Sequence, residues 1–235
     1  MEFEQEIQRS IGFRNEALAD KLRNVDLKHL PDELLCKIGI VMALSKKEEN
    51  NDVARTIQKM LVNKHDHSGP FQLIKWLLKL TQGYDRDNLA GQLIDWSDHH
   101  SDDILYSRVI LYVHDNNDPI EQIGAYVRHL EIFYDDTLAW IELGHLYMKE
   151  KLYDRAAFAY EEAISFVDDD SSFYVYAAEA RSNMDGDDNK SIARKQLSKA
   201  ILLDEKNMKA VDMLIELGGP NTEKLIQYRK LMNSK

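Results

Sequence analysis

Apolar residues recur at helical spacing along almost the whole chain, and no segment shows convincing alternation of apolar and polar residues. In the N-terminal third this spacing predicts helices near residues 13–23, 32–44, 50–63 and 70–82. Farther along it predicts helices near residues 85–97, 102–114 and 119–134. Polar turns separate these segments, and Pro31, Pro70 and Pro119 mark helix starts. The pattern therefore predicts an all-α protein.

Residues 137–170 hold the clearest pattern, which consists of two helices joined by a turn around Lys151. Seven residues share the two inner faces: Trp140, Leu143, Gly144 and Tyr147 on the first helix, and Ala156, Tyr160 and Ala163 on the second. This is the pattern of a tetratricopeptide repeat, in which small residues let paired helices approach closely and aromatic residues fill the remaining space. Only the proline expected near the end is missing, because Asp168 takes its place.

One such hairpin cannot bury its apolar face alone, so it predicts neighbouring repeats. A step of about 34 residues back from Trp140 leads to Tyr106, and a step forward leads to Tyr174. We expect a tetratricopeptide-repeat α-solenoid, a right-handed superhelix of antiparallel helix pairs. It should form a single domain over residues 1–235, with parts as follows: divergent helices over 1–83, recognisable repeats over 84–217 and a capping helix over 218–235.

Composition and charge narrow the function classes. The net charge is −11 and no basic stripe is visible, which disfavours nucleic-acid binding. The single cysteine, Cys36, lies in an apolar helical segment and is typical of a reducing compartment. The first ten residues lack the apolar stretch of a signal peptide, and the longest apolar run, Ile38–Leu44, is too short to span a membrane. We therefore expect a cytosolic chain with no transmembrane span.

Candidate chemistry is weak. Two histidine clusters, at residues 65–67 and 98–100, lie in predicted turns without cysteines, so solvated loop histidines are favoured over a metal site. The loop at residues 185–189 resembles a calcium loop, but Lys190 stands where glycine is required and Gln196 where glutamate is required, so we expect a polar turn. No nucleophile motif or phosphate-binding glycine loop is present. We expect no catalytic residues, no metal and no cofactor.

A binding surface remains. In a tetratricopeptide array, the first helix of each pair lines the concave face, where this register predicts a partner-binding groove. Its predicted lining residues are Ile104, Ser107, Leu111, Leu138, Ile141, His145, Met148, Val175 and Glu179. Alternatively, some of the apolar ones only pack against neighbouring helices. A charge introduced at Ile141 and Val175 should release a partner without unfolding the chain.

Chaperone-type repeats capture a carboxylate with Lys, Asn and Arg on this face. This chain has Ile141, Glu142 and His145 there instead, which disfavours capture of an acidic C-terminus.

Residues 136–217 resemble the family of subunit 2 of the endoplasmic reticulum membrane protein complex. The stretches that carry the resemblance are residues 139–163, 176–186 and 193–210. They include features beyond the generic repeat, namely Tyr153, the Ala156-Ala157-Phe158 triplet and the Glu161-Glu162 pair.

The resemblance implies a non-catalytic scaffold on the cytoplasmic face of the endoplasmic reticulum membrane, attached through its partners. It implies that the chain holds together the cytosolic parts of membrane-embedded subunits and packs against a soluble subunit. It also implies a complex that inserts tail-anchored and multipass membrane proteins. Two alternatives stay open: a free-standing tetratricopeptide adaptor for chaperone or other soluble complexes, and a helical enzyme that uses the histidine clusters.

Overall fold

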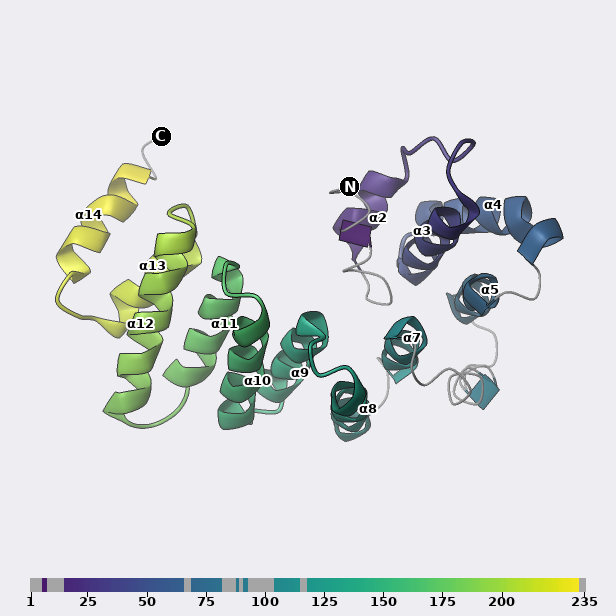
Figure 1. Ribbon diagram of the computed structural model, residues 1–235. Coiled ribbons are helices and arrows are strands. Elements are labelled where there is room, and N and C mark those ends of the chain that lie inside the picture. Colours follow the sequence, from purple (N-terminus) through teal and green to yellow (C-terminus); the bar gives the residue numbers. More distant parts are fainter. Residues whose placement is uncertain are drawn as a thin grey trace. The chain divides into compact units, whose positions relative to one another are not determined.

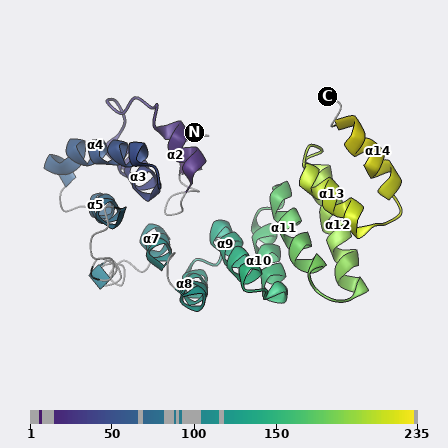
Figure 2. The same cartoon turned by 180° about the vertical axis from the view of Figure 1, so that it is seen from behind.

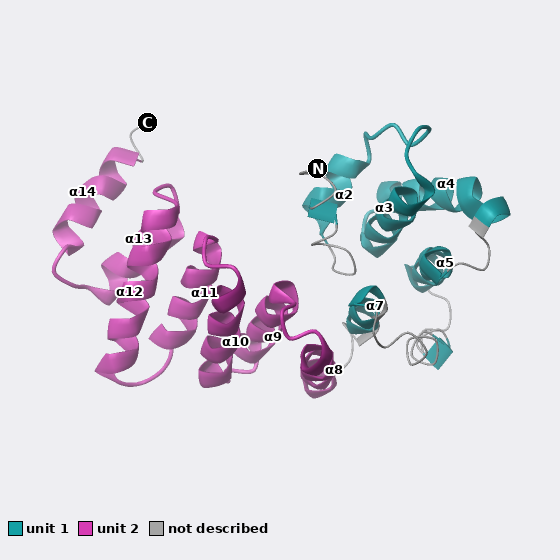
Figure 3. Cartoon of the chain, viewed as in Figure 1, with its two compact units in different colours: residues 1–117 teal, residues 118–235 magenta. Residues whose placement is uncertain are grey.

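The computed structural model divides the chain into two compact units, residues 1–117 (unit 1) and residues 118–235 (unit 2) (Figure 3). The residues that the structure describes are 6–7, 15–65, 69–81, 88, 91–92, 104–114 and 118–232. Within these ranges every regular element is a helix. The all-α prediction is confirmed. The single domain over residues 1–235 and its three parts stay a prediction.

The long described helices of unit 1 follow the predicted order. They are α2 (Glu16–Leu22), α3 (Asp32–Leu44), α4 (Glu48–His65), α5 (Gly69–Thr81) and α7 (Ile104–His114). The first four match the helices predicted in the N-terminal third, and α7 matches the one predicted near residues 102–114. The helix predicted near residues 85–97 lies almost entirely outside the described residues.

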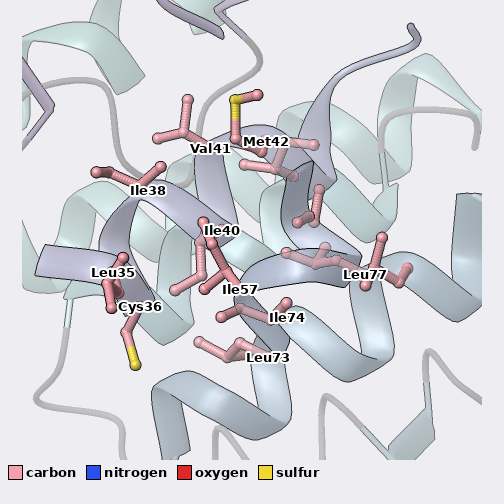
Figure 4. Close-up of a cluster of buried hydrophobic side chains, with 14 of the residues drawn as sticks. Leu35, Cys36, Ile38, Ile40, Val41, Met42, Ile57, Leu73, Ile74 and Leu77 are labelled. Carbon is pink, nitrogen blue, oxygen red and sulfur yellow. The ribbon is translucent and has the colours of Figure 1, made fainter. Parts of the chain in front are cut away.

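Helix α3 lies in the core of unit 1 because it packs against α2, α4 and α5. All its residues from Ile38 to Leu44 are buried, which explains the longest apolar run of the sequence as a helix buried all round. Gly39 permits the close approach of α5, since a Cβ at this position would lie 2.6 Å from Ile74 Cδ1. Figure 4 shows Ile74 and Ile57 beside Ile40 of α3.

Unit 2 is a row of helices in which each described helix packs against the next (Figures 1 and 2). They are α8 (Pro119–Ile132), α9 (Thr137–Lys149), α10 (Tyr153–Phe166), α11 (Ser171–Ser182), α12 (Asp187–Leu203), α13 (Met208–Leu217) and α14 (Thr222–Met232). Helices α9 and α10 are the hairpin predicted from the repeat pattern. Packing of each hairpin on its neighbour is the arrangement of a solenoid.

Side-chain caps set the starts of four helices in unit 2. Each cap accepts a hydrogen bond from a backbone N–H two or three residues ahead: Asp118 for α8, Asp136 for α9, Asp170 for α11 and Asn207 for α13. Such a bond satisfies a donor that has no partner within the helix. The acidic run at residues 168–170 thus ends in the cap of α11.

Gly144 and Tyr160 determine how closely α9 and α10 pack. The Tyr160 ring lies against the backbone of Gly144, because a Cβ at this position would be 2.4 Å from Tyr160 Cε1. Ala156 and Ala163 are fully buried in the same hairpin. Lys151 has a φ of 61° in the turn between the two helices, a left-handed conformation that reverses the chain tightly.

The turn before α12 is shorter than the sequence indicated. Helix α12 begins at Asp187, so residues 187–189 form its first turn and do not extend the loop. Carboxylates are favourable near the positive end of a helix dipole, and Gly186, with a φ of 104°, allows the sharp entry. The final helix, α14, has no buried residue and Leu231 is 64% exposed, so its capping role stays a prediction.

Candidate partner-binding site

The predicted groove residues lie on three helices. Helix α7 carries Ile104, Ser107 and Leu111, α9 carries Leu138, Ile141, His145 and Met148, and α11 carries Val175 and Glu179. Leu111, Ile141 and Val175 are only 3%, 6% and 2% exposed, so they pack inside the chain. A charge at Ile141 or Val175 would be buried without a partner, so we expect it to destabilise unit 2, whereas the sequence suggested that it would release a partner without unfolding the chain. The other six are at least partly exposed, and their partner-binding role stays a prediction.

His145 and Glu179 belong to a polar cluster on α9, α10, α11 and α13. His145 Nδ1 lies 2.7 Å from the Tyr160 hydroxyl, and the His145 ring packs edge-on against Tyr176, with the ring centroids 4.8 Å apart. Lys209 Nζ lies 2.7 Å from Glu179 Oε2 and 5.8 Å from the Tyr176 ring centroid. The cluster therefore joins three successive hairpins through side chains.

The cluster holds one ion pair beside neutral groups. Burial lowers the pKa of His145, while Glu179 and Lys209 act on it in opposite directions. Burial also raises the pKa of the Tyr160 hydroxyl, and Glu179 adds to this shift. At neutral pH the imidazole and the phenol are therefore uncharged, and both can form hydrogen bonds to polar side chains or to a peptide backbone.

A second surface of unit 2 is apolar. We call it the α8–α10 groove, an open hollow of about 420 Å³ with its lining on α8, α9 and α10. Its lining residues are Val127, Leu130, Glu131, Trp140, Leu143, Tyr147, Asp154, Arg155 and Phe158. Phe158 is 56% exposed and Val127 is 37% exposed, although both are large hydrophobic residues. Exposed apolar surface in a hollow is typical of an interaction site.

Aromatic contacts hold the lining of the α8–α10 groove in place. The Trp140 and Phe158 rings meet edge to face, with 6.0 Å between their centroids. The Trp140 indole N–H donates to the Tyr134 carbonyl oxygen at 2.8 Å, which fixes the orientation of the ring. The Arg155 guanidinium lies 6.0 Å from the Tyr147 ring centroid. A lining fixed in this way loses little entropy when a ligand binds.

The sequence did not identify Val127 and Phe158 as site residues, because the repeat pattern describes positions that are buried between helices. Phe158 lies on the exposed stripe of α10 together with Asp154 and Arg155. A large aromatic residue on that polar stripe was the available signal. Trp140 was expected only to fill the space between helices, and it also lines the α8–α10 groove.

The described residues show neither a metal-binding cluster nor a helix that could span a membrane. The histidine clusters at residues 65–67 and 98–100 lie outside the residues whose side chains are described. Among the described residues, no three His, Cys, Asp or Glu side chains are placed to hold a metal ion together. In the same part of the chain, no helix combines the length and the apolar character needed to cross a membrane.

No family model matches the chain. Curated relatives nevertheless share part of its sequence. The chain is 35% identical over 96 residues to "ER membrane protein complex subunit 2-A" of Xenopus laevis and to "ER membrane protein complex subunit 2" of Xenopus tropicalis. The matched stretch is 41% of this chain and spans 31% of the length of each relative.

Solved structures of MamA have a similar fold. MamA from Desulfovibrio magneticus RS-1 superposes with a TM-score of 0.51 over 78% of this chain and 93% of its own, at 15% identity. Another MamA structure gives a TM-score of 0.52 over 69% of this chain and 93% of its own, at 18% identity. MamA is a tetratricopeptide-type helical repeat protein. Because the sequence identity is low, this likeness supports the fold alone. The comparisons confirm two predictions: the chain has the tetratricopeptide-repeat α-solenoid fold, and over 96 residues it resembles ER membrane protein complex subunit 2.

Proposed function

We propose that the chain is a non-catalytic scaffold subunit of an endoplasmic reticulum membrane protein complex. The observation that carries this proposal is the 35% identity over 96 residues to subunit 2 of that complex. In the proposed role the chain lies on the cytoplasmic face of the membrane and is attached through its partners. It holds together the cytosolic parts of membrane-embedded subunits, packs against a soluble subunit, and so supports insertion of tail-anchored and multipass proteins.

The packing of unit 2 supports a scaffold. Its hairpins are fixed by buried small residues and by side-chain caps, so the partly exposed faces between them are preorganised. A preorganised surface orders a flexible partner segment at little entropic cost to itself. Two surfaces of unit 2 fit this use, namely the polar cluster around His145 and the α8–α10 groove.

Native co-purification tests the proposal. The full chain, tagged at one end and expressed in its own cell type, is purified from membranes solubilised in a mild detergent. We expect several membrane proteins to co-purify in a fixed ratio to the chain, and to remain with it through size-exclusion chromatography. Recovery with soluble chaperones alone, and no membrane protein, would instead support the free-standing adaptor.

A further inference from the structure

We propose that the α8–α10 groove binds a basic apolar segment of a partner protein. In this arrangement large apolar side chains of the segment enter the groove, and flanking Lys or Arg side chains meet its acidic rim. Cytoplasmic segments next to membrane spans carry an excess of Lys and Arg, so such a segment of a membrane subunit fits this chemistry. That identification rests on the proposed function, whereas binding of a basic apolar segment does not.

The α8–α10 groove presents large apolar side chains from α9 and α10. Trp140 and Leu143 of α9 line the groove, and the Phe158 ring of α10 contacts Trp140 while more than half of its surface is exposed. Burial of such side chains against a ligand removes apolar surface from water and so favours binding. Trp and other aromatic residues in a preformed pocket are the usual anchors of a protein interface.

Charge favours a basic partner. Glu131 and Asp154 lie on the groove, both are exposed, and neither forms an ion pair within the described residues. The cation of the groove, Arg155, lies over the Tyr147 ring. Residues 118–186 carry 15 acidic and 5 basic side chains, so the surrounding field is also negative. Complementary charges speed association and select among partners.

The same chain also offers a competing occupant. Residues 187–235 carry 10 basic and 7 acidic side chains, so this segment of a second copy has the charge that the groove would attract. Leu202 of α12 and Ile226 and Leu231 of α14 are 77%, 38% and 64% exposed. Helix α14 also carries basic side chains, but it is already held against α13 of its own chain, where Arg229 forms an ion pair with Asp212 at 2.6 Å. We therefore assign the groove to a separate partner, and the test includes self-association as an outcome.

Peptide binding to the purified full chain tests the proposal. Two fluorescent peptides of about 20 residues share a central stretch of Leu and Phe and differ only in their flanks, which are Lys and Arg in one and Glu in the other. Fluorescence anisotropy should show that the basic peptide binds and the acidic one does not. Raising the ionic strength from about 0.05 M to about 0.5 M should weaken binding of the basic peptide, since salt screens the attraction between its charges and the acidic side chains of the groove.

Variants separate the two parts of the groove. Phe158→Asp should weaken binding of the basic peptide about tenfold or more, as loss of an interface anchor does. The double change Glu131→Lys and Asp154→Lys should reverse the preference between the two peptides. Leu202→Asp is the matched control, because it adds the same charge at an exposed apolar residue of unit 2 outside the groove, and should leave binding unchanged.

Each outcome decides the proposal. Equal binding to wild type and Phe158→Asp, or equal binding of both peptides, overturns it, and so does a dimer of the free chain that Phe158→Asp dissolves. Circular dichroism checks the fold, and Val127→Asp replaces Phe158→Asp should the latter not fold. Peptide binding without membrane partners in the co-purification contradicts the proposed function alone, whereas membrane partners without peptide binding contradict the groove assignment alone.

Discussion

At the scale of single residues, Gly144 has no room for a side chain. The Tyr160 ring occupies the place of a Cβ, so Gly144→Ala should lower the free energy of unfolding by about 1–3 kcal/mol. Urea denaturation followed by circular dichroism measures the change. Gly124→Ala in α8 is the control, because its Cβ would meet only the flexible end of Arg128, and alanine there should be neutral or stabilising by about 0.5–1 kcal/mol. Equal effects of the two changes would contradict the packing described for α9 and α10.

Cys36 should be unreactive in the folded chain. It is 6% exposed, and burial together with the Asp32 and Glu33 carboxylates raises its pKa to about 11. Because the thiolate is the reactive form, only about one thiol in a thousand is ionised at pH 8. A thiol-specific reagent such as Ellman's reagent should therefore release colour only after urea unfolds unit 1. Rapid reaction in native buffer would show that α3 is not buried.

His145 should make the stability of unit 2 depend on pH. Because burial lowers its pKa below the ordinary value of 6.5, the unfolded chain binds this proton more readily than the folded one. The contribution is therefore fully present above pH 6.5 and is lost as pH falls below that value. Urea midpoints between about pH 7.5 and 5.5 measure the slope, and His145→Gln should reduce it. An unchanged slope in the variant would assign the pH dependence to other groups.

At the scale of helices, local signals in the sequence were sufficient to locate a helix where its start signal and its apolar spacing indicate the same segment. Proline starts, with helical spacing, located α3 and α8 because α3 has an acidic first turn and α8 has an Asp118 cap beside its apolar face. The turn at residues 185–189 was longer in the prediction, since acidic residues favour both loops and helix starts. Composition alone does not show whether acidic residues form a loop or the first turn of a helix. The packing of α12 shows that residues 187–189 belong to the helix.

The buried His129–Asp136 pair should join α8 to α9. His129 Nε2 lies 2.7 Å from Asp136 Oδ2, both side chains are 1% exposed, and Asp136 also caps α9. Asp136→Ala removes a cap and a buried hydrogen-bond acceptor, so we expect a loss of about 2–4 kcal/mol. Asp118→Ala removes an exposed cap alone and should cost about 0.5–1 kcal/mol by the same chemical denaturation. Similar losses in the two variants would show that the pair adds nothing to the cap.

At the scale of the whole molecule, the fold could be predicted from the sequence, whereas the candidate site could be located only with the structure. The repeat pattern specifies which residues are buried between helices, and therefore the fold. It does not specify which of the remaining residues meet across different helices, as Val127 and Phe158 do in the α8–α10 groove. The repeat pattern also did not predict the burial of Ile141 and Val175, because their exposure depends on how the neighbouring hairpin packs.

Unit 2 should fold without unit 1. Each of its helices packs against its sequence neighbours, and the caps at Asp118, Asp136, Asp170 and Asn207 all lie within it. Stability in a solenoid is a sum of hairpin terms and nearest-neighbour terms, so a fragment of residues 118–235 should be helical and melt cooperatively by circular dichroism. A fragment of residues 136–235 lacks α8 and thus the partner of Asp136, and should melt at a lower temperature. Equal melting temperatures for the two fragments would show that α8 is not part of the cooperative unit, and the α8–α10 groove would then lack a fixed wall.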